Sequence, residues 1–323
     1  MPSTYWKENY HKGIIMGYFL DHGLTETTET DQQCFDECMA NVIPFTAAWE
    51  NLDDSMKIMA WDSEWEKYLK HRAELIEYEG WDEYLPWNLY KSLGLKWMDG
   101  YNYIQTLGDC CGHAHKNSLK VSNLVNAHRT GKTTRELALS VAYGIARGNG
   151  RMNHGSGCNL NPMSKWSATV GNYWASDFGK YDGGRYIDKY RKGLQHDKNA
   201  LKTQSLIIYL PNPNFEFCYA ACAAGFGINI GTNIYPTGSK VNADGLAQAS
   251  AWKSGAHAVA LIAAFQGKSG RRYVFMENSH GAKYSSDSLN PNRQWGCWCD
   301  ENDIKRMATE RFGRWYCQLG EMG

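Results

Sequence analysis

The chain has 323 residues, in which 34 lysine and arginine side chains balance 34 aspartate and glutamate side chains. This length is ample for a packed core. A net charge of zero leaves no basic excess for binding nucleic acid. The longest apolar runs, such as residues 256–265, are well short of the roughly 18 residues that cross a membrane. We therefore expect a globular protein with neither nucleic-acid nor membrane partners.

The ten cysteines are too sparse for a scaffold built on disulfides. The first eight residues lack the basic segment and the apolar run of a signal peptide, so we expect a cytoplasmic, reducing location with most thiols free. Cys297 and Cys299 form a Cys-x-Cys pair without a second ligand pair at the spacing of a zinc site. No metal or cofactor is predicted.

In chain order, the first segment is residues 1–84, which are rich in tryptophan, tyrosine and charged side chains. Residues 62–79 have the charge pattern of an exposed helix. Pro86 pushes the preceding Leu85 out of helical geometry and marks a boundary. We therefore predict a helical extension or tether over residues 1–84 and a separate domain over residues 85–323.

The next segment, about residues 85–202, is predicted to be mainly helical. A loop over residues 148–161 contains four glycines, among them Gly155 and Gly157. The helices are expected at residues 108–128, 136–147 and 163–178.

From about residue 203 to the end, strand patterns dominate. Two apolar runs, residues 256–265 and 272–277, flank a glycine-containing turn, as in a β-hairpin. Further strands are predicted at residues 205–210 and 225–231, with one helix at 215–224. The fold class predicted is therefore α+β, with a helical half that faces a β-rich half.

The first feature with chemical potential is the start of the helix predicted at residues 108–128. Gly108 supplies a tight turn and Asp109 is a favourable N-cap residue. Cys110 then lies in the first helical turn, where the helix dipole and the free amide groups favour a thiolate. Cys110 is therefore a candidate nucleophile.

Two further side chains complete a possible catalytic group. His257 begins one strand of the predicted hairpin and Asn278 follows the other, so the hairpin would bring them together. His257 would take the proton of Cys110, and the side-chain oxygen of Asn278 would fix the tautomer of His257. Gln105 and the backbone amide of Cys110 could hold an oxyanion.

The order of these motifs resembles the papain-like cysteine peptidase family. The matching residues are Gln105, the Gly108-x-Cys110 turn that opens a helix, His257 followed by Ala-Val, and Asn278 in Asn-Ser-x-Gly. The resemblance implies a two-lobed fold and a thioester acyl-enzyme that hydrolyses peptide or protein substrates. It also implies that Gly155 and Gly157 line the substrate.

Three departures from the family pattern bear on the site. The distance along the chain from Gln105 favours Cys111 as the nucleophile, whereas the Gly-x-Cys turn favours Cys110. His280 replaces the tryptophan of Asn-Ser-Trp-Gly, so the bond between Asn278 and His257 is either more exposed or shielded by another aromatic ring. The divergent motif and the tryptophan-rich extension resemble papain-like proteins encoded by bacteriophages.

Two alternative functions remain open at this stage. One is a catalytically weak or inactive structural protein of a virion, in which residues 1–84 contact other copies or other virion proteins. The other is a cell-wall hydrolase of the NlpC/P60 or CHAP type. The Asn-Ser-x-Gly motif after a strand favours the papain-like peptidase over these hydrolases, which more often orient the histidine with another polar residue.

Overall fold

The computed structural model divides the chain into two compact units, Met1–His71 and Arg72–Gly323. The described residues all belong to the second unit: 85–87, 104–105, 108–130, 135–139, 141–143, 157, 160–169, 171–178, 181, 205–210, 213–223, 225–280, 284–287, 289, 295–308 and 315–321. The helix predicted at 62–79 and the loop residue Gly155 lie outside them. The boundary predicted at Leu85 stays a prediction.

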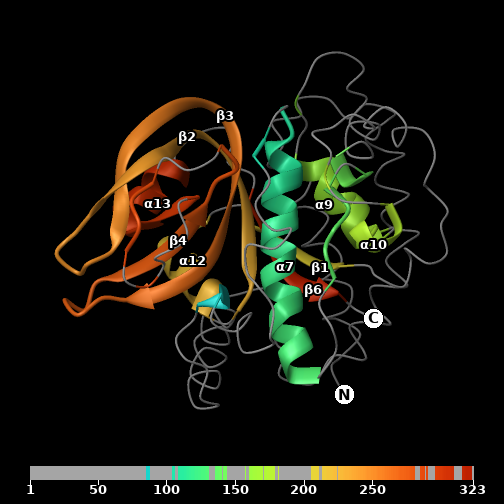
Figure 1. Ribbon diagram of the computed structural model, residues 1–323, viewed down its shortest axis with the longest axis horizontal. Helices are drawn as coiled ribbons and strands as arrows, with labels where there is room; N and C mark the ends of the chain where they lie inside the picture. Colours follow the sequence, from blue (N-terminus) through green and yellow to red (C-terminus); the bar gives the residue numbers. More distant parts are fainter. Residues whose placement is uncertain are drawn as a thin grey trace, which may run out of the picture. The chain divides into compact units, whose positions relative to one another are not determined.

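The long helix α7, Cys110–Thr130, is the central helix of the described part (Figure 1). Its residues 111–122 are all buried, including the polar side chains of Lys116 and Ser118. The Lys116 ammonium lies 2.9 Å from a carboxylate oxygen of Glu136, which offsets the cost of burying a charge. The predicted helix at 108–128 is confirmed.

Two shorter helices, α9 (Leu160–Thr169) and α10 (Ala175–Phe178), lie on the side of α7 away from most of the sheet (Figure 1). A single helix over 163–178 was expected, and this prediction is wrong. Gly171 has a φ of 109° and its amide donates to the carbonyl of Trp166, a glycine helix end that stops α9. Of the helix predicted at 136–147, residues 139 and 141–143 are helical.

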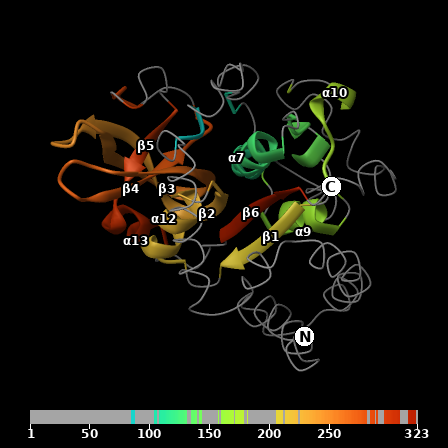
Figure 2. The ribbon, with the colours of Figure 1, turned by 90° about the horizontal axis from the view of Figure 1, so that it is seen from below.

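The β-rich half is one six-stranded sheet in the order β1-β6-β2-β3-β4-β5, which Figure 2 shows from below. Two short helices, α12 (Phe215–Ala223) and α13 (Glu301–Ala308), accompany it. The strands are β1 (Ser205–Leu210), β2 (Gly227–Val241), β3 (Ala247–Gln266), β4 (Arg272–Glu277), β5 (Gly296–Cys299) and β6 (Trp315–Glu321).

The predicted hairpin is confirmed as β3 and β4, which pair antiparallel from Ala260 opposite Glu277 to Gln266 opposite Arg272. The strand β2 pairs antiparallel with β3 over most of its length. The predicted α+β order, with helices first and strands second, is therefore confirmed. The strands predicted at 205–210 and 225–231 and the helix at 215–224 also correspond to β1, β2 and α12.

Helix α7 packs directly on the sheet where β2 begins. A Cβ on Gly227 would lie only 2.3 Å from the carbonyl oxygen of Ser118, so only glycine fits there. The Ser122 hydroxyl accepts from the Gly227 amide at 3.1 Å and donates to the Gln318 carbonyl of β6. These bonds fix α7 against β2 and β6, and thus fix Cys110 relative to the sheet.

The hydrophobic core next to the sheet contains aromatic rings grouped around Trp298. Trp298 is fully buried, and its indole nitrogen donates to the Asp287 carboxylate at 3.0 Å. Trp87 and Phe275 contact its ring edge to face. A parallel pair between Gln248 of β3 and Trp298 of β5 closes the sheet on this core. Among the helices of the described ranges, none has the length and apolar character to cross a membrane.

Candidate active site

The thiol of Cys110 lies at the start of α7 and faces β3. It packs against the buried cluster that contains Ala258, the residue after His257, and the backbone amide of Ala258 lowers its pKa. Asp109 precedes the helix, and its carbonyl accepts from the amides of Gly112 and His113. The structure therefore brings the candidate nucleophile to the segment that carries the candidate base.

The choice between Cys110 and Cys111 follows from the disulfide in the structure. Cys111 is disulfide-bonded, whereas Cys110 is a free thiol. The other described cysteines are also free, so the partner of Cys111 lies outside the described residues. A sulfur held in a disulfide has no thiol to ionise, which leaves Cys110 as the candidate. This disulfide was not expected for a reducing compartment.

His257 and Asn278 are in direct contact, as the hairpin predicted. The Nε2 atom of His257 lies 2.9 Å from the side-chain oxygen of Asn278. That oxygen also accepts from the backbone amide of Ser279 at 2.7 Å, so the ring nitrogen is the donor in the first bond. The Nδ1 atom of His257 is then the ring acceptor, which is the form a general base needs.

The amide group of Asn278 is fixed on its other side as well. Its nitrogen donates to the Tyr284 hydroxyl at 2.7 Å and to the Pro236 carbonyl at 3.3 Å. The Tyr284 hydroxyl in turn donates to the same Pro236 carbonyl at 2.8 Å. The orientation of His257 is therefore set by a network that reaches from β4 back to β2.

Gln105 is tied to the loop that follows Asn278. The backbone amide of Gln105 donates to the Ser279 carbonyl at 2.9 Å. The Ser279 hydroxyl donates to the side-chain oxygen of Gln105 at 2.6 Å. Because the oxygen accepts from Ser279, the side-chain nitrogen of Gln105 is on the opposite side of the group. Sequence analysis missed this role of Ser279, although the Asn-Ser-x-Gly motif contains it.

Two aromatic rings flank the imidazole of His257, and neither contact was predicted. His280 stacks on it, with ring centroids 4.2 Å apart and planes inclined by 23°. Tyr235 of β2 lies 4.3 Å away at an angle of 45°. His280 thus occupies the shielding position that the sequence left open when it replaced a tryptophan.

Of the two predicted substrate-lining glycines, only Gly157 is among the described residues. Its φ is 111°, and its amide donates to the Tyr143 hydroxyl at 2.9 Å. The same hydroxyl donates to the Gly108 carbonyl at 3.0 Å. Tyr143 therefore connects the glycine loop to the turn that precedes Cys110. A role of Gly157 in binding stays a prediction.

Burial opposes charge on both members of the pair. It raises the pKa of the Cys110 thiol to about 11, partly offset by the Ala258 amide and reinforced by the charge of Asp109. It lowers the pKa of the His257 imidazole to about 3, against the effect of the hydrogen bond that Nε2 donates to Asn278. The expected preference for a thiolate at the helix start is thus outweighed, and both the Cys110 thiol and the His257 imidazole are neutral at rest.

A buried acid lies immediately beside the nucleophile. Asp109 is fully buried, accepts from the Tyr181 hydroxyl at 2.6 Å, and has a pKa raised to about 6 by burial. The Nε2 atom of His113 is 3.6 Å from its other oxygen. Burial lowers the pKa of His113 to about 3, so this histidine is neutral. In the described part of the chain, no three histidine, cysteine or acidic side chains are grouped as metal ligands.

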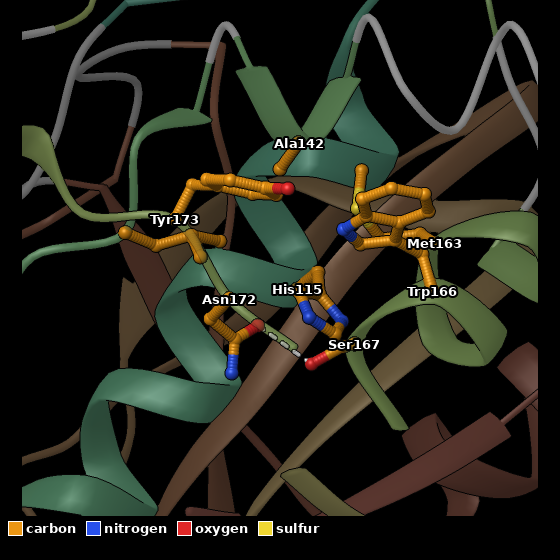
Figure 3. A pocket seen from close by; sticks show the side chains of 8 residues that line it. His115, Ala142, Met163, Trp166, Ser167, Asn172 and Tyr173 are labelled. Carbon is orange, nitrogen blue, oxygen red and sulfur yellow. Dashed lines mark hydrogen bonds between the residues drawn. The ribbon is translucent and has the colours of Figure 1, made fainter. Parts of the chain in front are cut away.

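A small pocket lies elsewhere, between α7, α9 and the segment before α10 (Figure 3). His115 lines it, and the Ser167 hydroxyl donates to the side-chain oxygen of Asn172 at 2.7 Å. The Asn172 nitrogen donates to the Ser205 hydroxyl of β1 at 2.8 Å. None of the predicted site residues lines this pocket, and its hydrogen bonds link the helices to the sheet edge.

Comparisons with known proteins give structural similarity only. No protein-family model and no curated protein matches the chain. Among solved structures, the ragweed cysteine protease Amb a 11 in its proform matches with a TM-score of 0.43 and 14% identity, over 69% of this chain and 64% of that one. The match therefore spans less than two thirds of the ragweed proform.

Two further solved structures are similar to this chain. The bromelain protease of Ananas comosus, in complex with the inhibitor E64, matches with a TM-score of 0.42 and 14% identity, over 68% of this chain and 95% of that one. Xylellain, a cysteine protease from Xylella fastidiosa, matches with a TM-score of 0.44 and 12% identity, over 67% of this chain and 82% of that one. The ragweed and Xylella proteins are described as cysteine proteases, and bromelain is described as a protease. The resemblance to phage-encoded proteins stays a prediction.

Proposed function

We propose that this chain is a thiol hydrolase that cuts peptide bonds through a thioester on Cys110. The observation that carries the proposal is the convergence of three groups. A free thiol packs against the cluster that contains Ala258, the adjacent His257 is oriented by Asn278, and Gln105 is bonded to the same loop as Asn278. This arrangement is that of a nucleophile, a base and the group that orients the base.

The first half of the reaction forms the acyl-enzyme. The sulfur of Cys110 attacks the carbonyl carbon while its proton passes to Nδ1 of His257. The charge that develops on the carbonyl oxygen is held by the Cys110 amide and the side-chain nitrogen of Gln105, and removing one such donor typically lowers the rate by about 10²–10³. The carbon–nitrogen bond then breaks, and His257 returns its proton to the leaving amine.

The second half releases the product. Water gives a proton to His257 and attacks the thioester carbon, after which the carbon–sulfur bond breaks and the sulfur recovers its proton. Because burial favours the neutral pair, His257 acts here as a general base whose charge appears only during each step. The resting enzyme therefore needs no preformed ion pair.

Labelling with a thiol-reactive epoxide or iodoacetamide at neutral pH tests the proposal. We expect rapid modification of Cys110, located by mass spectrometry of peptides, and a loss of that rate in His257→Ala. Cys218 and Cys317, which are buried and free, serve as internal controls that should stay unlabelled. Equal labelling in the intact chain and in His257→Ala would contradict the proposal.

A second candidate function is a non-catalytic structural or binding module with this fold. The observation that favours it is desolvation, which holds the half-buried Cys110 thiol and the buried His257 imidazole in their neutral forms. On this alternative, the protein would show no peptidase activity, and the alkylation rate of Cys110 would rise only as the pH approaches the pKa of its thiol, about 11. A pH profile of alkylation from 5 to 10 separates the two.

A further inference from the structure

The ring that stacks on His257 is itself ionisable, which distinguishes this site from one shielded by an indole. His280 is exposed, whereas His257 is buried. Their centroids are 4.2 Å apart and their planes nearly parallel. An imidazole in water changes charge near pH 6.5, within the range in which hydrolases work. A proton on His280 therefore places a positive charge against the face of His257.

The reaction proposed above requires a positive charge on His257 in each proton transfer. Like charges about 4 Å apart repel even in water, and more strongly where solvent is displaced. A protonated His280 therefore raises the barrier to forming the His257 imidazolium. A neutral His280 presents only its aromatic face, and this stacking keeps the ring of His257 in the plane that bonds Asn278.

We propose that His280 is a positioning residue for this site, which holds the plane of His257 when neutral and opposes the imidazolium on His257 when protonated. The inference rests on the proposed function. It gives the enzyme a lower limit of pH that is set by a surface histidine rather than by the Cys110–His257 pair.

The other groups that face His257 do not provide the same effect. Tyr235 of β2 contacts both rings but carries no charge when protonated, and burial raises its pKa further. Lys253 of β3 also contributes a positive charge near His257. It therefore lowers activity at every pH without adding a step to the profile.

The groups on and next to α7 do not produce the loss of activity at acid pH that is assigned to His280. His113 interacts with both His257 and His280, but its pKa is lowered to about 3 by burial, so it stays neutral. Asp109, beside the nucleophile, has a pKa of about 6, which falls in the same range. Its protonation removes a negative charge near Cys110, so it favours the thiolate at acid pH and acts in the opposite direction to His280.

The test compares His280→Trp, which keeps a flat ring but cannot be protonated, with the intact chain. We expect kcat/KM and the Cys110 alkylation rate of the intact chain to fall below about pH 6.5. For each protein, kcat/KM at pH 5.5 is divided by its value at pH 8. This ratio should be about fivefold or more higher in His280→Trp than in the intact chain. Parallel profiles for the two proteins would overturn the inference.

Two further variants separate the stacking role from the charge. His280→Ala should lower kcat at all pH values, because the His257 ring loses its support, and should lack the acid-side step. Lys253→Gln is the matched charge control. It should raise kcat/KM by the same factor at every pH. If Lys253→Gln removed the acid-side step and His280→Trp did not, the switch would belong to another group and the inference would be wrong.

A measurement that needs no catalysis distinguishes failure of this inference from failure of the proposed function. In Cys110→Ala, the ring titration of His257 can be followed by NMR with and without the second change His280→Trp. We expect the protonated fraction of His257 at pH 5 to rise by about fivefold or more in the double variant. An unchanged fraction would overturn the inference, whereas absence of labelling at Cys110 would overturn only the proposed function.

Discussion

The carboxyl group of Asp109 sits one residue before the candidate nucleophile with no exposed surface. Burial, the largest effect, raises its pKa from 3.8 to about 6, and the hydrogen bond from Tyr181 lowers it. The folded protein therefore binds this proton more tightly than the unfolded chain does. The favourable contribution is complete below about pH 3.8 and is lost as the pH rises through about 6.

We predict that Asp109→Asn stabilises the protein above pH 6. Asparagine is an equally good N-cap residue, and it removes the cost of a buried charge. The free energy of unfolding in urea should rise by about 1–3 kcal/mol at pH 7.5. The difference should shrink as the pH is lowered towards 4. Equal gains at both pH values would show that the charge of Asp109 is not the cause.

The contacts around His257 show what could be predicted at the level of residues. The pairing of His257 with Asn278 followed from a hairpin and a motif, both local in the sequence. The ring of Tyr235 could not be placed, because the register between β2 and β3 shifts between Thr232 and Ile234, and the ring of His280 could not be placed because it lies in the loop after β4. A shift of this kind turns side chains to new neighbours without a clear signal in the sequence.

At the level of elements, the contact between α7 and the start of β2 positions the nucleophile. The backbone of β2 at Gly227 lies against the backbone of Ser118, where a Cβ would come within 2.3 Å of the carbonyl oxygen. Backbone atoms cannot move aside as a flexible side chain can. Any larger residue at this position must push the helix away from the sheet.

We predict that Gly227→Ala destabilises the protein by about 3 kcal/mol or more, because the added methyl group overpacks a buried contact. Gly112→Ala is the matched control. Gly112 lies inside α7, and its Cβ would meet Tyr143 at 3.5 Å, an ordinary contact. That change should leave stability unaltered or raise it by up to about 1 kcal/mol. Urea unfolding of both variants checks the prediction, and similar effects in the two would contradict it.

Elements were predicted best where one strong signal dominated. The helix α7 and the hairpin of β3 and β4 followed from periodicity and a glycine turn. The strand β3 begins at Ala247 rather than 256, because its first half carries small and polar residues that are partly exposed. The four residues of β5 are too few to show a pattern, although they are fully buried. Their place is set by pairing with β4.

At the level of the whole molecule, three buried histidines determine how the fold responds to acid. Burial lowers the pKa of His113, His115 and His257 to about 3 in each case. The unfolded chain binds these protons near pH 6.5, whereas the folded protein does not. Stability is therefore present above about pH 6.5 and is lost as the pH falls towards 3. Asp109 and Asp303, whose pKa values burial raises to about 6, act in the opposite direction, but they are two groups against three.

We predict that the free energy of unfolding falls steeply between pH 7 and pH 4.5. Each histidine can contribute up to about 2–3 kcal/mol over this interval. Urea titrations at half-unit steps of pH, with proton uptake measured on unfolding, check this. Net uptake of about one proton per molecule at pH 5 is the expected result, because the three histidines take up nearly three protons and Asp109 and Asp303 release nearly two. Net release of protons would show that these histidines are protonated or exposed in the folded protein.

The disulfide at Cys111 has a practical consequence for work with Cys110, its neighbour in the chain. Reagents such as dithiothreitol, which are added to keep a reactive sulfur from oxidising, also attack disulfides. The same treatment that protects one sulfur would thus open the bridge beside it and loosen the helix start. Preparations made in an oxidising host compartment, and protected by mild or brief reduction, should keep both sulfurs in their native states.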